Sequence, residues 1–580
     1  MQSAKIKAEQ VQMDHKSTII YKKDIKKTAF FSLLIILFNY LFYFNVLRLG
    51  YFDIDDPFYL IKNPALTNTN LNSLKTILFE PCFFNYSPVH ILSYVMDNQL
   101  AGGMNPYTLH LSSVLWGSLV SVIMFFVIDY HLKNRVFSFL AALLFSVHPT
   151  HVEVIAWLSS RKDLLATFFG LLALYFWLRY SDSKKARSYY WFSLISYIIA
   201  ILSKTSIALL PLFLLLHDYL KNKKLSAVDL VNKTPFAVIT MMIIAIVKSV
   251  QPDLGNPLLS FGSLIAESFH SIWILSGFGK HAIFRPRLES ISQTEVFLGG
   301  LISIFFILAF VLVKKNKKLI LFSILWIGGM LLPPLSMNFL YPVADRYLFL
   351  SSVGLVWLIT LGLIKLYHYR DFPLLKPLSL LIYLILFAAW SYQSRSYLSE
   401  WSDPKSIWHF MAEKYLCDQN VSNYALHILN SCNEELESKG SLLDRKKALF
   451  AAREKCGAKA LEQLARISED SINPKSDYFY AKGKSHFYCG HMNSTIKNLK
   501  TYLGNIEEWS IGFKIEKITA SYYILGFCYR ELEDYKNAIF CWRQVDNLQR
   551  QQGEETYPGI IKGITELEKQ RNRKPSKSMN

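Results

Sequence analysis

The sequence predicts an all-α protein: a helical domain that crosses a membrane many times, followed by a soluble helical domain. The 580 residues are 52% hydrophobic and only 18% charged, which favours a membrane protein over a soluble one. Long apolar runs continue to about Gln393, and from Ser394 onward the chain is polar, charged and helical in pattern. The basic residues behind the net charge of +19 gather in short loops between the apolar runs, as the positive-inside rule describes. This placement argues against a nucleic-acid partner.

Four segments follow from this composition. Residues 1–27 are a basic N-terminus expected to stay in the cytoplasm, and residues 28–393 are the membrane domain. Residues 394–570 are the soluble helical domain, and residues 571–580 are an end expected to be disordered. The first apolar run is interpreted as an uncleaved span, because it is too long for a signal peptide and lacks a small-residue cleavage site.

About eleven spans are predicted, because eleven apolar runs approach the length that a helix needs to cross a bilayer. The segment 258–284 is also apolar, but it carries Glu267, His270, Lys280 and His281 and is interpreted as a helix lying along the interface. The predicted spans are 28–48, 108–130, 136–150, 164–180, 189–203, 205–220, 234–250, 295–313, 319–338, 347–367 and 373–393.

Counting spans from a cytoplasmic N-terminus places every basic short loop on the cytoplasmic side. These basic loops are 131–135, 184–187, 221–224 and 314–318. The opposite side then receives the loop 49–107, the turns near 148–161, 203–204 and 341–346, the segment 251–294 and the soluble domain. The motif-bearing loops are therefore expected to share one non-cytoplasmic face.

Two adjacent acids, Asp55 and Asp56, lie just beyond the first span in the sequence Asp-Asp-Pro-Phe-Tyr. Carboxylates at the water-facing mouth of a membrane domain can accept a proton from a substrate. They are also hard oxygen ligands suited to Mg, Mn or Ca, so a divalent cation is the one cofactor left open. The alternative is an Asp-Pro turn that only closes the loop.

The rest of the loop 49–107 carries His90, Asp97 and His110 among aromatic residues, and is expected to fold as short helices on the membrane surface. His90 and Asp97 are seven residues apart, so a helix would place them on nearly the same face.

The end of the third predicted span carries His148, His151 and Glu153, in a spacing that is not a standard zinc pattern. Pro149 between the histidines is expected to interrupt the helix at a point where the backbone lines a cavity. Further polar residues at span ends are candidates for holding a phosphate or another polar head group: Arg161, Lys162, Lys204, Arg285, Arg287, Asp345, Arg346 and Tyr347. The alternative for Arg161, Lys162 and Lys204 is interfacial snorkelling. For the Asp345–Tyr347 cluster the alternative is an ion pair beside an aromatic belt residue.

The soluble domain shows a helix-turn-helix repeat at tetratricopeptide spacing. Gly526 marks the clearer copy and Gly483, 43 residues earlier, a weaker one. The expected role of such a domain is binding of a protein or peptide, and the alternative is a stabilising cap without a ligand. Six of the seven cysteines lie here. Burial as small helix residues is favoured over disulfide formation, which would require an oxidising compartment.

Taken together, these residues resemble the bacterial relatives of the transmembrane and tetratricopeptide-repeat O-mannosyltransferases, which are glycosyltransferases of the GT-C superfamily. The resemblance covers most of residues 28–410. It is carried by the motifs Asp55–Tyr59 with Asn63-Pro64, Tyr86–His90, Asn105–His110, His148–Glu153, Arg161–Asp163, Pro211 through Tyr219, and Ala344–Tyr347. The tail departs from the family's longer repeat arrays.

The resemblance implies a sugar donor linked to a polyprenyl phosphate, an active site on the outer face and a catalytic base at Asp55 or Asp56. Arg161, Lys162, Lys204 and Arg346 are then candidates for the donor phosphate. His90, Asp97, His110, His148, His151, Glu153, Asp345 and Tyr347 are candidates for substrate binding.

The function expected is transfer of a sugar, with mannose as one candidate, to a protein serine or threonine or to a glycan. The expected location is a bacterial inner membrane, with the C-terminal domain on the periplasmic or extracellular side. A non-enzymatic membrane scaffold and, ranked lower, a transporter of a lipid-linked substrate are the alternatives.

Overall fold

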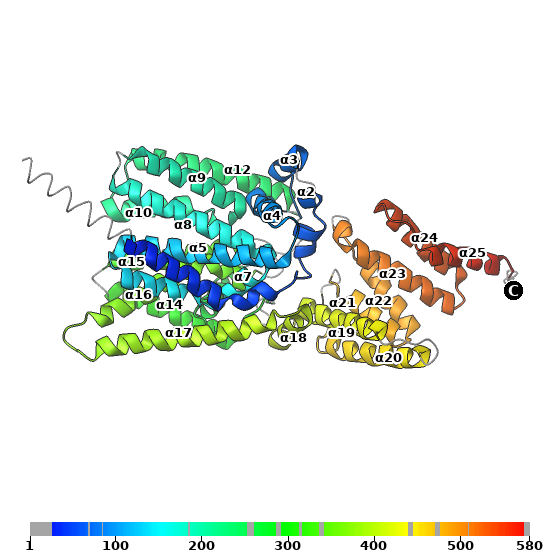
Figure 1. Cartoon of the computed structure of the whole chain (residues 1–580). Coiled ribbons are helices and arrows are strands. Elements are labelled where there is room, and N and C mark those ends of the chain that lie inside the picture. The colour runs from blue at the N-terminus through cyan, green and yellow to red at the C-terminus, as the bar shows by residue number, and fades with distance from the viewer. Residues whose placement is uncertain are drawn as a thin grey trace, which may run out of the picture. The chain divides into compact units, whose positions relative to one another are not determined.

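A computed structural model describes residues 26–67, 70–83, 85–183, 186–251, 260–285, 292–312, 316–335, 342–438, 445–469, 472, 476–507 and 510–573. Residues 1–25 of the basic N-terminus, Arg287 and most of the predicted disordered end lie outside these residues. The chain divides into two units, Met1–Asp403 and Pro404–Asn580. Within the described residues the elements are helical, which confirms the all-α prediction (Figure 1).

The first unit is a bundle of long helices with a cap of short ones (Figure 1). Its first helix covers 26–42. The following elements are η1 (Phe44–Arg48), η2 (Pro57–Ile61), α2 (Pro64–Thr67), α3 (Leu71–Phe79), α4 (Pro88–Ala101), α5 (Pro106–Leu132), α6 (Arg135–Ser146), α7 (His151–Ala156), η3 (Leu158–Ser160), α8 (Arg161–Asp182), α9 (Arg187–Ser203), η4 (Thr205–Ile207), α10 (Leu210–Asn222), α11 (Ala227–Val231), α12 (Thr234–Val250), α13 (Phe261–Leu275), α14 (Gln293–Leu312), α15 (Lys317–Leu335), α16 (Asp345–Tyr367) and α17 (Leu375–Glu400).

Seven helical segments in the described part of the chain are long and apolar enough to cross a membrane, so we treat the protein as an integral membrane protein. They are α5, α8 with η3, α12 with α11, α14, α15, α16 and α17. The other four predicted spans coincide with shorter helices: 26–42, α6, α9 and α10. The count of eleven therefore stays a prediction, as does the interfacial placement of α13.

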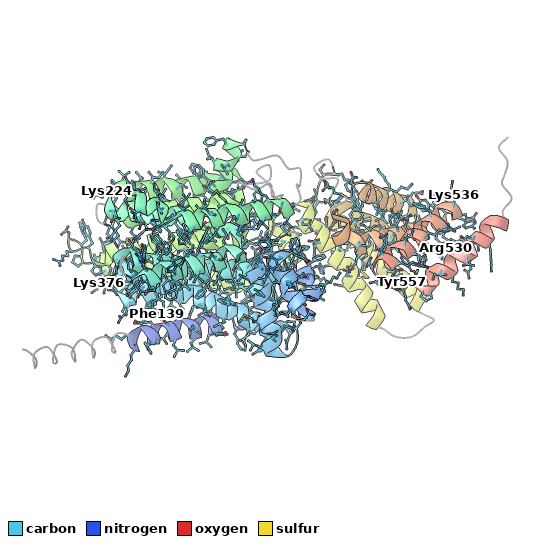
Figure 2. The ribbon with its side chains drawn as sticks, turned by 90° about the horizontal axis from the view of Figure 1, so that it is seen from above. Phe139, Lys224, Lys376, Arg530, Lys536 and Tyr557 are labelled. Atoms are coloured by element: carbon cyan, nitrogen blue, oxygen red, sulfur yellow. A yellow bond between two sulfur atoms is a disulfide. The ribbon has the colours of Figure 1, made fainter. Side chains whose placement is uncertain are left out.

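The two ends of this bundle differ in character. Lys224 and Lys376, which follow α10 and begin α17, lie at the same end (Figure 2). The short helices α2, α3, α4 and α7 gather at the opposite end (Figure 1). This separation is what the predicted topology requires, because it keeps the basic loops apart from the motif-bearing loops.

The first helix fixes the start of the loop that carries Asp55. Its Phe31 ring lies 5.1 Å from the ring of Phe139, which Figure 2 labels on α6. Its Asn39 amide donates to the Ser146 hydroxyl at 3.0 Å, and the Tyr43 hydroxyl donates to the Ser146 carbonyl at 2.8 Å. Buried hydrogen bonds between helices hold their ends in register, so the chain enters the outer loop from a fixed point.

The second unit consists of consecutive helices: α18 (Pro404–Lys414), α19 (Asp418–Ser438), α20 (Arg445–Leu464), α21 (Tyr478–Tyr488), α22 (Met492–Gly504), α23 (Ile511–Glu531), α24 (Tyr535–Gln551) and α25 (Pro558–Arg573). Gly483 on α21 lies directly against Leu499 on α22, and Gly526 on α23 against Trp542 on α24. Both glycines let paired helices approach closely, as the repeat pattern predicts, while the repeat family itself stays a prediction.

A disulfide joins Cys432 on α19 to Cys456 on α20. The sequence favoured burial over disulfide formation for the cysteines of this domain, and this pair is an exception. Cys528 and Cys541 are instead buried helix residues, as the favoured alternative expects. A disulfide is typical of an oxidising compartment, so this pair supports the predicted non-cytoplasmic location of the second unit.

Candidate functional site

Four residues from distant parts of the first unit line one cavity: Asp55, Lys162, Lys204 and Arg346. The cavity has a volume of about 230 Å³. Asp55 precedes η2 and Lys204 precedes η4, while Lys162 and Arg346 are the second residues of α8 and α16. The remaining lining residues are Tyr59, Phe83, Asn85, Asp163, Thr205, Ser206, Gln251, Met330, Pro333, Pro334, Tyr347 and Leu350. Four loops that the predicted topology assigned to one face therefore meet at one site.

Three cationic side chains and two carboxylates line the cavity, so the formal net charge of its lining is +1. Two of the cations are paired: the Lys204 ammonium lies 2.6 Å from the Asp163 carboxylate. The Arg346 guanidinium lies 2.5 Å from the carboxylate of Glu153 on α7, behind the lining. Paired cations keep a fixed position and still offer their remaining N–H donors to an anion.

Lys162 differs from the other two cations. Its ammonium lies 3.4 Å from the Tyr59 hydroxyl and 4.8 Å from the centre of the Tyr59 ring. Among the described residues it forms no ion pair within 4 Å. An ammonium without a neutralising carboxylate is a ready partner for an anionic ligand.

Asp55 is partly exposed and lines the cavity. Burial raises the pKa of its carboxyl above the usual value, while the charges of Lys162, Arg346 and Lys204 oppose this rise. A raised pKa makes a carboxylate a stronger proton acceptor once it is ionised.

Asp56 points away from the cavity lining and is fully buried. Its carboxylate accepts from the backbone N–H of Phe52 at 2.8 Å, from the backbone N–H of Ser159 at 2.9 Å and from the Ser159 hydroxyl. Burial raises the pKa of Asp56 to about 7, although these donors act in the opposite direction. Asp56 thus ties the outer loop to η3, directly before α8.

Arg161 is buried and is not among the residues that line the cavity, so its predicted contact with the donor phosphate stays a prediction. Its guanidinium lies 2.5 Å from the Asp97 carboxylate and donates to the Leu109 carbonyl at 2.6 Å. It also lies 4.4 Å from the centre of the Tyr94 ring. A buried, paired arginine of this kind holds α4 and α5 against the start of α8.

His90 and Asp97 lie along one face of α4, as their spacing predicts. His90 Nε2 is 2.7 Å from the Tyr94 hydroxyl, which donates to the Leu158 carbonyl at 2.6 Å. Burial lowers the pKa of His90 well below its usual value, and the charges of Lys162 and Arg161 add to this effect. A neutral histidine therefore packs against Tyr59, which lines the cavity, with 5.1 Å between ring centres.

The other three histidines predicted for the site also bond to protein groups. His110 Nε2 lies 3.1 Å from the Gly50 carbonyl, and His148 Nε2 lies 2.8 Å from the Leu275 carbonyl. His151 Nε2 lies 2.9 Å from the Ser352 hydroxyl. These contacts place all three around the site and outside the cavity lining.

Asp345 and Arg346 are adjacent at the start of α16, but their side chains contact different groups. The Asp345 carboxylate pairs with Arg285 and lies 3.1 Å from His281 Nδ1, whereas Arg346 faces the cavity. Tyr347 also lines the cavity, with its ring centre 5.2 Å from the Lys204 ammonium.

The donor set around Asp55 does not fit a divalent cation. Both oxygens of Asp56 accept hydrogen bonds from the protein, and Asp55 faces three cationic side chains. In the part of the chain that the structure describes, no group of three His, Cys, Asp or Glu side chains is arranged to hold a metal ion.

Sequence reasoning missed Asp163 and Ser159. Asp163 pairs with Lys204 and lines the cavity, and Ser159 binds Asp56. Asp163 directly follows Lys162 in the Arg161–Asp163 motif, and this adjacency was a usable signal. Ser159 had no comparable signal, since its partner lies 103 residues away.

Residues 94–250 match a protein family described as dolichyl-phosphate-mannose-protein mannosyltransferase. Similar proteins include the mouse protein O-mannosyl-transferase TMTC1, 32% identical over 145 residues, and the human protein O-mannosyl-transferase TMTC4, 36% identical over 103 residues. Over these stretches the chain is similar to O-mannosyltransferases, which confirms the resemblance predicted from the motifs. That the similarity lies with bacterial members of the group stays a prediction.

The comparison covers only part of each protein. The match to mouse TMTC1 spans 23% of this chain and 15% of that relative, and the match to human TMTC4 spans 15% and 14%. The family match includes Lys162, Asp163 and Lys204 of the cavity, whereas Asp55 and Arg346 lie outside it.

Proposed function

We propose that this relative of the O-mannosyltransferases is itself a membrane glycosyltransferase. It moves a sugar, with mannose as the first candidate, from a polyprenyl-phosphate donor to a serine or threonine hydroxyl of a protein or to a glycan. The observation that carries the proposal is the presence of Asp55 in one cavity with Lys162, Lys204 and Arg346. The names of the family and of the relatives support mannose and a protein acceptor.

In the proposed reaction, the Asp55 carboxylate accepts the proton of the acceptor hydroxyl as its oxygen bonds to the anomeric carbon of the sugar. The bond from that carbon to the phosphate oxygen breaks, and the phosphate leaves with the electron pair. Lys162, Lys204 and Arg346 hold the phosphate and stabilise the charge that it gains. The apolar wall of Met330, Pro333, Pro334 and Leu350 suits the first units of the lipid chain.

Asp56, Arg161 and Asp345 have positioning roles in this proposal, since each bonds to protein groups that surround the cavity. The cavity lies at the non-cytoplasmic face, and the second unit, on the same side, is proposed to bind a protein partner. A bacterial inner membrane, with the N-terminus in the cytoplasm, is the proposed location.

The test measures transfer of radiolabelled mannose from a polyprenyl-phosphate donor in membranes that contain the full chain. Asp55→Asn should abolish transfer, whereas Asp53→Asn should not, because Asp53 is exposed in the same turn and does not line the cavity. Equal transfer by both variants would remove Asp55 from the reaction. No transfer by the wild-type chain with any common hexose donor would favour the membrane scaffold.

A further inference from the structure

A second pocket, of about 260 Å³, lies in the outer loop between α2, α3 and α4. Its walls include the apolar residues Phe58, Ile77, Phe83 and Ile91 and three prolines. Polar side chains also line it: Lys62, Asn63, Thr76, Glu80 and Ser87. The pocket belongs to no part of the reaction proposed above.

This pocket and the cavity share a wall. Phe83 lines both, and its ring stacks on Phe58 with 4.5 Å between ring centres. Phe58 faces the pocket, while the next residue, Tyr59, faces the cavity. A ligand that extends from Asp55 across Phe83 would therefore enter the pocket.

A tight turn completes this wall. Cys82 and Asn85 exchange two backbone hydrogen bonds, of 2.9 and 3.0 Å. Cys82 lines the pocket and Asn85 lines the cavity. The turn thus holds the two spaces at a fixed separation, which would impose a fixed spacing on a ligand that occupies both.

A buried polar atom lines the pocket. The side chain of Ser87 is 4% exposed, and its hydroxyl has no hydrogen-bond partner among the residues that the structure describes. Buried hydroxyls are normally bonded, so an unsatisfied one at the edge of a pocket indicates a group supplied by a ligand.

We propose that this pocket binds an apolar side chain that neighbours the accepting serine or threonine of a polypeptide acceptor, with a backbone group of the acceptor bonded to the Ser87 hydroxyl. The inference rests on the proposed function for the accepting hydroxyl. The rings of Phe58 and Phe83 and the side chains of Ile77 and Ile91 form the apolar part of this lining, which suits an apolar side chain of the acceptor.

The test uses the full chain in detergent and two labelled seven-residue peptides with a central threonine, one flanked by alanines and one by leucines. Binding is followed by fluorescence polarisation and transfer by mannose incorporation. Thr76→Trp fills the pocket from its exposed rim on α3, and Lys75→Trp, exposed on the same helix outside the pocket, is the matched control. Ser87→Ala removes the hydroxyl without loss of a helix cap, because this side chain makes no capping bond.

The wild-type chain and Lys75→Trp should bind the leucine peptide about tenfold more tightly than the alanine peptide. Thr76→Trp should abolish this preference and leave the alanine peptide unaffected, and Ser87→Ala should weaken both peptides several-fold. An unchanged preference in Thr76→Trp, or equal binding of both peptides by the wild-type chain, would overturn the inference. Binding that follows the expected pattern without mannose transfer would support the pocket and refute the proposed reaction.

Discussion

Asp55 and Asp56 are adjacent in the chain, yet only Asp55 lines the cavity, while the Asp56 carboxylate is bonded to the backbone of Phe52 and to Ser159. The two acids therefore have separable roles. One is placed to act on a substrate, and the other holds the loop that places it.

Replacing each acid in turn should separate these roles. Asp55→Asn should lower transfer by about 10²- to 10⁴-fold with little change in thermal stability, because it removes a proton acceptor from an open cavity. Asp56→Asn should lower stability by about 1–3 kcal/mol, because an amide cannot accept from donors on both sides. Transfer rates and melting temperatures in detergent measure both effects. A stable Asp56→Asn variant would show that these hydrogen bonds are dispensable.

The pair of Lys204 and Asp163 should show strong coupling. Lys204→Met leaves the buried Asp163 carboxylate without its cation, and should destabilise the protein by about 3–5 kcal/mol. Adding Asp163→Asn should restore much of that stability but not transfer, if Lys204 binds the phosphate. A double-mutant cycle on melting temperature and on the KM for the donor tests this. Recovery of full transfer in the double variant would exclude Lys204 as a phosphate ligand.

The pH dependence of transfer should reflect Asp55. Its pKa is raised by burial, so the carboxylate is lost as the pH falls through a value above that of an ordinary aspartate, and transfer falls with it. Lys162→Met removes a charge that opposes the rise, so it should move the acidic limb to higher pH. Rates measured between about pH 4 and pH 9 test the shift, and Lys75→Met, exposed on α3 and outside the lining of both the cavity and the second pocket, is the control. A shift to lower pH would contradict the assignment.

The disulfide between Cys432 and Cys456 should stabilise the second unit. It closes a loop with a sequence separation of 24, and replacing both cysteines by serine should cost about 3 kcal/mol. Reductant should lower the melting temperature of the wild-type chain and leave the double variant unchanged. Cys489→Ser, at a partly exposed cysteine outside the bond, is the control. Ready alkylation of Cys432 or Cys456 in intact cells would show that the bond does not form there.

The two ends of the membrane unit should face different compartments. In a variant without other reactive cysteines, Lys224→Cys and Lys376→Cys should react only with a reagent that reaches the cytoplasm. Leu71→Cys, on the exposed surface of α3, should react with an impermeant reagent added from outside. Equal labelling of all three positions from outside would contradict the proposed topology.

The sequence by itself determined the fold class, the two-part organisation and the resemblance to O-mannosyltransferases, because hydropathy, charge placement and short motifs are local properties of the chain. It also led to Asp55, Lys162, Lys204 and Arg346, which topology assigned to one face. Only the tertiary structure decided which of the neighbouring polar residues reach the cavity. Asp56 bonds to the buried backbone of Ser159, and Arg161 pairs with the carboxylate of Asp97, so neither lines the cavity. Asp163 pairs with Lys204 and does line it. Those partners lie 41 to 103 residues away, and no local pattern encodes such distances.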